Sequence, residues 1–149
     1  MLRTPATRQD AASEKTPILC CAPVISIVDD DASVRDAMNG FVRSLGYVAA
    51  TFRSAEEFLC SERLNDTSCL IADVQMPGLD GLELQGHLIA EGHPLPMIFV
   101  TAFPEERIRT RALKAGAFGF LSKPFEEETL IDCLNKALGR DTAGGGAAL

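Results

Sequence analysis

Short apolar runs alternate with helix-like patterns along most of the chain. After each run, apolar residues recur every three or four positions, which is typical of an amphipathic helix. The predicted strands are residues 24–28, 47–52, 68–72, 96–100 and 117–121, and the predicted helices cover about 34–45, 54–59, 82–89, 104–115 and 126–138. This alternation predicts an α/β fold: a five-stranded parallel sheet with helices on both faces and right-handed crossovers.

The periodic part of the sequence is the right size for one domain. The chain has 149 residues, which is enough for a single domain of about 120 residues with short tails. Residues 1–22 are rich in Thr, Ala, Ser and charge without a period, and we expect a flexible leader there. We expect the domain over residues 23–140 and a flexible, glycine-rich tail over 141–149.

Residues that can carry chemistry follow four of the five predicted strands. Asp29 and Asp30 come after the first strand, and Asp73 ends the third strand just before a Pro-Gly turn. Thr101 follows the fourth strand and Lys123 the fifth. Because parallel strands end at one edge of the sheet, these side chains are expected to converge there.

This set of side chains suits phosphoryl transfer to an aspartate. Clustered carboxylates repel one another unless a cation neutralises them, and Mg2+ prefers such oxygen ligands. Asp30, Asp73 and the backbone carbonyl of Gln75 would form a sufficient partial shell for Mg2+. Lys123 could pair with an anion that joins the carboxylates, and the Thr101 hydroxyl could bond one oxygen of that anion.

Each residue taken alone has a simpler structural explanation. One of the aspartates 29–31 could cap the first helix, and we expect Asp31 to do so. Asp73 could be a turn residue, Lys123 before a proline could lie in an exposed turn, and Thr101 could reflect β propensity. Four such residues in the right order after four strands favour the site.

Charge and cysteine content narrow the class of protein. The net charge of −7 and pI near 4.8 argue against direct binding of nucleic acid. The five cysteines form no CxxC pair and no zinc-type spacing, which fits a reducing cytoplasm. Cys69 and Cys133 fall in apolar patterns and are expected in the core, whereas the adjacent pair at 20–21 could be oxidised. The apolar run 18–28 is about half a membrane span and contains a proline, so we expect neither a membrane span nor a secretory signal.

Four segments resemble the receiver domain of two-component response regulators, which is CheY-like, with the flavodoxin-like doubly wound (βα)5 fold. They are VDDDASVRDAM, LIADVQMPGLDGLEL, PMIFVTAF and GAFGFLSKPFEEETL, and the similarity spans about residues 23–140. The first and last segments are closest to the FixJ-type subgroup. The resemblance implies that a histidine kinase or phosphotransfer protein phosphorylates Asp73.

The same resemblance implies roles for the neighbouring residues. Asp30, Asp73 and the Gln75 carbonyl would bind Mg2+ directly, and Asp29 would bind it through water. Thr101 would be the switch hydroxyl, and Lys123, which the family places before a cis proline, the phosphate contact. Phe120 matches the family's aromatic switch position, although simple core burial also explains an aromatic residue there.

The resemblance also implies how the domain would pass its signal to a partner. The face built from the fourth helix, fifth strand and fifth helix would change shape and be recognised by a downstream protein or a second copy. FixJ-type regulators usually continue into a DNA-binding domain, whereas this chain ends about ten residues past its last predicted helix. Output would then pass through protein contacts, unless the chain is a fragment of a transcriptional regulator.

Other functions agree less well with the sequence. A receiver is not an enzyme, since its only chemistry is on itself. A phosphatase of the haloacid dehalogenase kind needs a second carboxylate two residues after the nucleophile, where this chain has Gln75. A degenerate receiver is disfavoured because no key residue is missing. We also hypothesise that Phe103, two residues after Thr101, limits water access and prolongs the phosphorylated state.

Overall fold

The computed structural model describes residues 22–93 and 95–139, so nearly all of the predicted leader and the whole predicted tail lie outside the described part. The strands are β1 (Val24–Val28), β2 (Val48–Phe52), β3 (Cys69–Asp73), β4 (Met97–Thr101) and β5 (Gly119–Ser122). The helices are α2 (Ala32–Ser44), α3 (Ala55–Leu59), α4 (Arg63–Asp66), α5 (Gly81–Ala90), α6 (Glu106–Lys114) and α7 (Glu127–Ala137).

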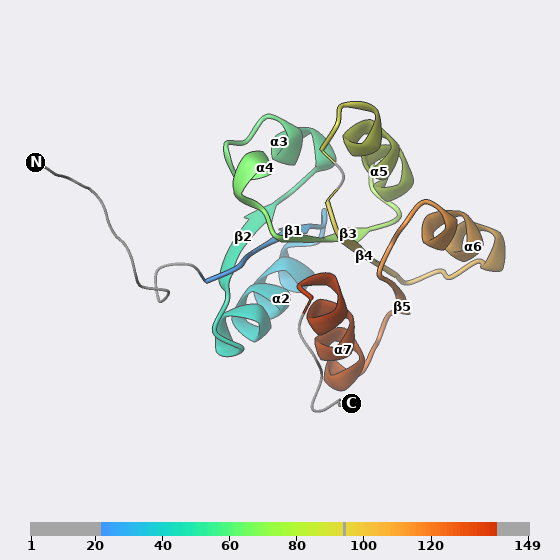
Figure 1. Ribbon diagram of the computed structural model, residues 1–149. Coiled ribbons are helices and arrows are strands. Elements are labelled where there is room, and N and C mark those ends of the chain that lie inside the picture. Colours follow the sequence, from blue (N-terminus) through green and yellow to red (C-terminus); the bar gives the residue numbers. More distant parts are fainter. Residues whose placement is uncertain (1–21, 94, 140–149) are drawn as a thin grey trace, which may run out of the picture.

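All five strands are parallel, in the order β2-β1-β3-β4-β5. This is the doubly wound order found in flavodoxin and CheY, and it confirms the predicted fold class. In Figure 1, α3, α4 and α5 lie above the sheet and α2 and α7 below it, with α6 beside β5. The chain reverses direction across the sheet between β1 and β3, which makes their carboxyl ends the topological switch point.

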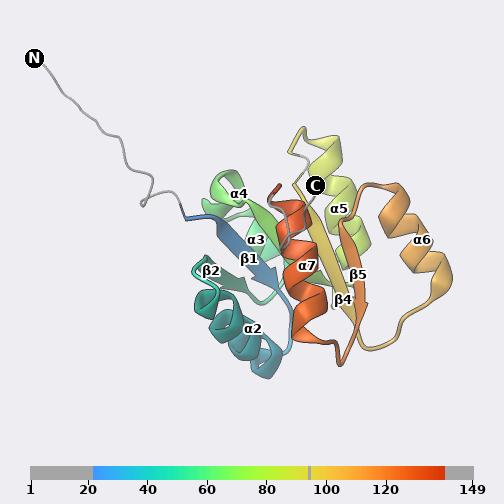
Figure 2. The same ribbon diagram turned by 60° about the horizontal axis from the view of Figure 1, so that its bottom comes forward.

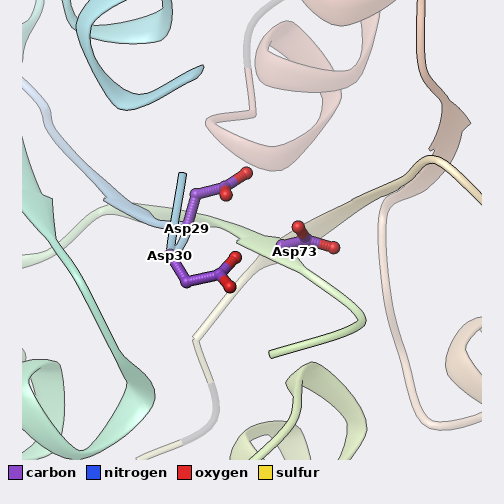
Figure 3. Close-up of side chains that lie close together, drawn as sticks. All are labelled: Asp29, Asp30 and Asp73. Atoms are coloured by element: carbon purple, nitrogen blue, oxygen red, sulfur yellow. The ribbon is translucent and has the colours of Figure 1, made fainter. Parts of the chain in front are cut away.

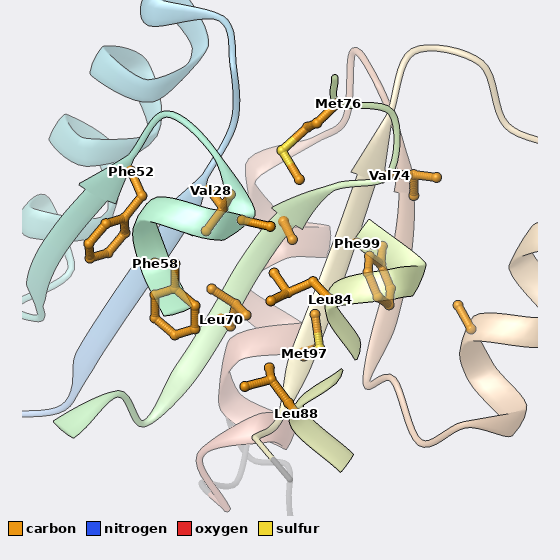
Figure 4. Packing of buried hydrophobic residues seen from close by; sticks show 13 residues of the cluster. Val28, Phe52, Phe58, Leu70, Val74, Met76, Leu84, Leu88, Met97 and Phe99 are labelled. Carbon is orange, nitrogen blue, oxygen red and sulfur yellow. The ribbon is translucent and has the colours of Figure 1, made fainter. Parts of the chain in front are cut away.

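Two apolar layers hold the helices against the sheet. Because side chains alternate along a strand, Leu70 and Ala72 of β3 face one layer while Cys69 and Ile71 face the other. The upper layer, which includes Phe58, receives side chains from α3, α5 and α6 (Figure 4). The lower layer joins α2 and α7, which lie side by side in Figure 2. Strands buried on both faces explain why β3 and β4 are almost wholly apolar.

Local signals fix the start of two helices near the switch point. Asp31 is the N-cap of α2 and accepts hydrogen bonds from the N–H groups of Ser33 and Val34 at 2.8 and 3.4 Å. The prediction that Asp31 is a cap is therefore confirmed. Asp80 caps α5 through a reciprocal capping box with Glu83.

The structure adds one short helix to the prediction and shifts most element boundaries by one or two residues, most clearly at α6 and β5. The single turn α4 was not predicted, because four residues are too few to show a helical period. Helix α6 begins at Glu106 rather than 104, since Glu105 is its N-cap and is still extended. Strand β5 begins at Gly119 rather than 117, because the N–H of Ala117 bonds back to the carbonyl of Ala112 at the end of α6.

Candidate functional site

Three aspartates from two strands meet at the switch point. Asp29 and Asp30 directly follow β1, and Asp73 is the last residue of β3. Each contributes a carboxylate oxygen, and these oxygens all lie within 4.8 Å of one another. Figure 3 shows the three side chains close together at the ends of the two strands. Asp29 and Asp73 are 1% and 7% exposed, whereas Asp30 is exposed. The sequence prediction that these residues converge is confirmed.

Lys123 joins the two buried carboxylates. Its Nζ donates to Asp29 Oδ2 at 3.0 Å and to Asp73 Oδ2 at 3.1 Å, although the lysine follows β5, two strands away from β3. The peptide between Lys123 and Pro124 is cis, as the resemblance implied. Because the Lys123 side chain is only 20% exposed, its ammonium group interacts with the two carboxylates largely shielded from water.

Backbone groups fix the orientation of the same two carboxylates. The N–H of Asp31 donates to Asp29 Oδ1 at 2.9 Å, and the N–H of Gln75 donates to Asp73 Oδ1 at 3.0 Å. Each buried carboxylate therefore has one oxygen bonded to its own loop and the other bonded to Lys123. The carboxyl groups of Asp29 and Asp73 are thus held in place by the loops that follow β1 and β3.

The electrostatics of the site depend on burial and on charge pairing. Burial raises the pKa of the Asp73 carboxyl above its usual value of 3.8, and the hydrogen bond from Gln75 and the charge of Lys123 offset this only in part. Burial alone would lower the pKa of the Lys123 ammonium. The hydrogen bond and charge of Asp29, together with Asp73, outweigh burial and raise the pKa of Lys123 above its usual value of 10.5.

The donor set fits a hard divalent cation. Three carboxylates and one ammonium leave two negative charges without a partner within the cluster. Among the described residues, no donor reaches the Gln75 carbonyl, so this oxygen is free to act as a further ligand. Oxygen ligands with an excess negative charge of two are what Mg2+ prefers, and one ligand, Asp30, is open to solvent.

Among the described residues, neither Thr101 nor Phe120 is bonded to the carboxylate cluster. Thr101 is 1% exposed, and its hydroxyl accepts a hydrogen bond from the N–H of Phe103 at 3.1 Å; in the described part of the chain it bonds no carboxylate. Phe120 is partly buried against the upper core layer, with its ring centroid 6.5 Å from that of Phe99. Both residues lie on strands beside the site.

Two residues that support the site were missed by sequence reasoning. Arg35 Nη1 donates to the backbone carbonyl of Asp29 at 2.7 Å, and Glu56 Oε2 accepts from the N–H of Leu79 at 3.1 Å. Arg35 stands in the α2 pattern with no feature that sets it apart. Glu56 lies 23 residues before its partner, so no local spacing could have indicated the contact.

Comparison with known proteins assigns the class of domain. The sequence pattern of the response regulator receiver domain matches residues 25–135. The chain is 38% identical over 117 residues to the transcriptional regulatory protein TdiR of Thauera aromatica and 36% identical over 114 residues to the transcriptional regulatory protein FixJ of Bradyrhizobium diazoefficiens. It covers 52% and 56% of these two relatives, which cover 78% and 76% of it. The solved response regulator StyR superposes with a TM-score of 0.74 at 42% identity, over 79% of this chain and 60% of that one.

The chain therefore belongs to the response regulator receiver domain family of two-component systems. The resemblance deduced from the four sequence segments is thereby confirmed. The chain spans about half the length of the curated relatives it matches. In the described residues, none of the helices has the length and apolar character needed to span a membrane.

Proposed function

We propose that Asp73 accepts a phosphoryl group from a phosphorylated histidine of a kinase or phosphotransfer protein. The single observation that supports this best is the position of Lys123, whose Nζ bridges Asp29 and Asp73 at 3.0 and 3.1 Å. A fixed ammonium group beside a buried carboxylate stabilises the charge that develops when a phosphoryl group reaches that carboxylate.

The transfer exchanges one phosphorus bond for another. An Asp73 carboxylate oxygen attacks phosphorus, a P–O bond forms, and the P–N bond to the donor imidazole breaks. The imidazole nitrogen leaves with the electron pair and takes a proton from solvent. Because its pKa is raised, Lys123 keeps its proton and its charge throughout.

Asp30, Asp73 and the Gln75 carbonyl would hold Mg2+ directly, and Asp29 would hold it through water. When bound, Mg2+ supplies positive charge that neutralises the carboxylates and the incoming phosphoryl oxygens. The excess of two negative charges in the cluster supports this assignment. The burial that raises the pKa of Asp73 also supports it, because a carboxylate of this kind gains most from a cation.

Incubation with a small phosphodonor and Mg2+ tests the proposal against its alternatives. A receiver takes up one phosphoryl group per chain and loses it only slowly by hydrolysis. Rapid, continuous release of phosphate would indicate that the protein is a phosphatase, and no labelling would indicate a degenerate receiver. We infer that the protein is not an enzyme on other molecules, since Gln75 stands where a phosphatase would need its second carboxylate.

Phosphorylation would be transmitted by Thr101 and Phe120. The phosphoryl oxygens on Asp73 offer new acceptors, so the Thr101 hydroxyl would leave the N–H of Phe103 and donate to them. Phe120 would then move into the space that Thr101 vacates, since both residues lie on adjacent strands. The partial burial of Phe120 supports such a movement.

The surface that changes would be formed by α6, β5 and α7, which are the fourth helix, fifth strand and fifth helix of the predicted pattern. Strand β5 is an edge strand of the sheet. The net exposed charges of the two helices have opposite sign: α6 carries Arg107, Arg109, Arg111 and Lys114 against Glu106, and α7 carries Glu127, Glu128 and Asp132 against Lys136. A two-fold arrangement that places α6 of one copy on α7 of the other would pair these charges.

We propose a second copy as the partner at this surface, with a downstream protein as the alternative. Sizing the protein with and without beryllium fluoride, a mimic of the phosphoryl group, tests the choice. A dimer that forms with the mimic and weakens at high salt supports the second copy. A protein that stays monomeric supports a downstream protein as the partner instead.

Since Cys60, Cys69 and Cys133 are free thiols, a cytoplasmic location is proposed.

A further inference from the structure

The loop that follows Asp73 is fixed at its two ends but lacks backbone bonds in the middle. At the ends, the N–H of Gln75 bonds Asp73 Oδ1, and the N–H of Gly81 bonds the Val74 carbonyl at 3.0 Å. Within the described chain, no backbone carbonyl accepts from the N–H groups of Met76, Gly78 and Leu79, and Pro77 has no N–H group. Loops without backbone bonds need side chains to fix their course.

One side chain from outside the loop supplies such a bond. Glu56, in α3, accepts the N–H of Leu79 through Oε2 at 3.1 Å. A Cβ atom on Gly78 would lie 2.8 Å from the same oxygen, and Gly78 has a φ of +77°. The carboxylate therefore rests directly on the turn, and the absence of a side chain at residue 78 permits the close approach.

The neighbouring Glu57 carries the same charge as Glu56 but makes different hydrogen bonds. Glu57 Oε1 accepts the N–H of Arg53 at 2.7 Å, and the N–H of Glu57 bonds Ser54 Oγ at 3.0 Å. Glu57 thus caps its own helix and bonds nothing in the loop that follows Asp73. Both glutamates are exposed, so truncating either leaves no cavity in the core.

From this geometry we infer that Glu56 is a positioning residue for the phosphoacceptor loop. By holding Leu79, it fixes the course of residues 75–80 and hence the direction of the Gln75 carbonyl. This inference rests on the proposed function, because the Gln75 carbonyl is the oxygen that would bind Mg2+. Truncating Glu56 would remove this hydrogen bond, whereas a glutamine of the same reach would keep it in a weaker, uncharged form.

Four variants of the full chain separate the effect of side-chain length at residue 56 from the effect of its charge. Glu56→Gln keeps the reach and an acceptor oxygen, Glu56→Asp keeps the charge but is one methylene too short, and Glu56→Ala removes both. Glu57→Ala is the control of equal charge change on the same helix. The readouts are exchange of the Leu79 amide proton and the Mg2+ dissociation constant from amide shifts of Gln75, both measured by NMR on unphosphorylated protein.

We expect Glu56→Ala and Glu56→Asp to weaken Mg2+ binding about tenfold, the low end for residues that support metal ligands, and to speed exchange at Leu79. We expect Glu56→Gln and Glu57→Ala to bind Mg2+ like the wild type. The inference is overturned if Glu56→Ala matches Glu57→Ala in both readouts, or if Glu56→Gln matches Glu56→Ala. Failure of the proposed function is a separate outcome, namely a wild-type protein that binds Mg2+ but is not phosphorylated.

Discussion

Lys123 and Asp73 are 50 residues apart in sequence and form an ion pair of 3.1 Å between Nζ and Oδ2. The same ammonium donates to Asp29, so one cation serves two buried carboxylates. This arrangement arises because β1, β3 and β5 are parallel and end at one edge of the sheet. It gives the site its charge, its geometry and its dependence on pH.

Replacing Lys123 with methionine should destabilise the protein at neutral pH by about 1.5–3 kcal/mol, the range for hydrogen bonds to charged groups. The pKa of Lys123 is raised in the folded state, so its contribution is complete below pH 10.5 and is lost as pH rises through the raised value. Urea unfolding of both proteins at pH 7 and in strong alkali measures this. A difference in stability that stays constant across that range contradicts the assignment.

Replacing Asp73 with asparagine should stabilise the protein at pH 7 in the absence of divalent cations, by on the order of 1 kcal/mol. The pKa of Asp73 is raised on folding, so ionisation of this carboxyl costs stability as pH rises through the raised value. Thermal unfolding in a chelator and in Mg2+ tests this. Asp73→Asn should also lose most of the stabilisation by Mg2+, which for a wild type at 100 times its dissociation constant is about 2.7 kcal/mol.

Gly81 and Gly86 are both in α5 but should respond oppositely to alanine. A Cβ at Gly81 would lie 2.6 Å from the Asp73 carbonyl oxygen and 3.1 Å from the Phe99 ring, so Gly81→Ala should destabilise by about 1–3 kcal/mol. Nothing lies within 4 Å of a Cβ at Gly86, so Gly86→Ala should stabilise by about 0.5–1 kcal/mol. Chemical denaturation distinguishes the two. Equal effects would mean that the start of α5 is not packed against β3.

Phe103 should affect how long the phosphorylated state lasts. Phe103 is 69% exposed in the loop that follows β4, and its N–H bonds Thr101 Oγ1. Phe103→Glu should lose the phosphoryl group severalfold faster, because a carboxylate admits and orients water where the ring limits it. Phosphate release after removal of the donor measures the rate. Phe118→Glu, which alters an exposed ring just before β5, is the control and should match the wild type.

The sequence alone was sufficient to predict the features of the fold and the site that follow from the direction of the strands. Once five parallel strands were predicted, Asp29, Asp73 and Lys123 had to meet at one edge, and the structure confirms that they do. Cys69 and Cys133 are buried in the lower core layer, as their apolar surroundings predicted. Each of these predictions needs only a strand or helix period and the rule that parallel strands end together.

The features that the sequence did not predict depend mainly on contacts between segments that are far apart in the chain. The bond from Glu56 to Leu79 exists only because α3 packs beside the turn after β3, and a sequence period carries no information on such a meeting. Arg35 bonds a backbone carbonyl, which every residue possesses, so its partner could not be predicted either. The helix α4 depends on the Ser61 hydroxyl, which accepts the N–H of Arg63 at 2.9 Å, rather than on an apolar pattern.

Locating the phosphoryl group tests the central claim most directly. Intact mass spectrometry, followed by peptide mapping, would be applied to the wild type, Asp73→Asn and Asp31→Asn after treatment with a small phosphodonor in Mg2+ or in a chelator. Asp31 lies beside the cluster but caps α2, a task that asparagine also performs. The account predicts one phosphoryl group on Asp73 in the wild type and in Asp31→Asn, only with Mg2+, and none in Asp73→Asn. Labelling of Asp73→Asn to the wild-type level, or equal labelling in the chelator, would contradict it.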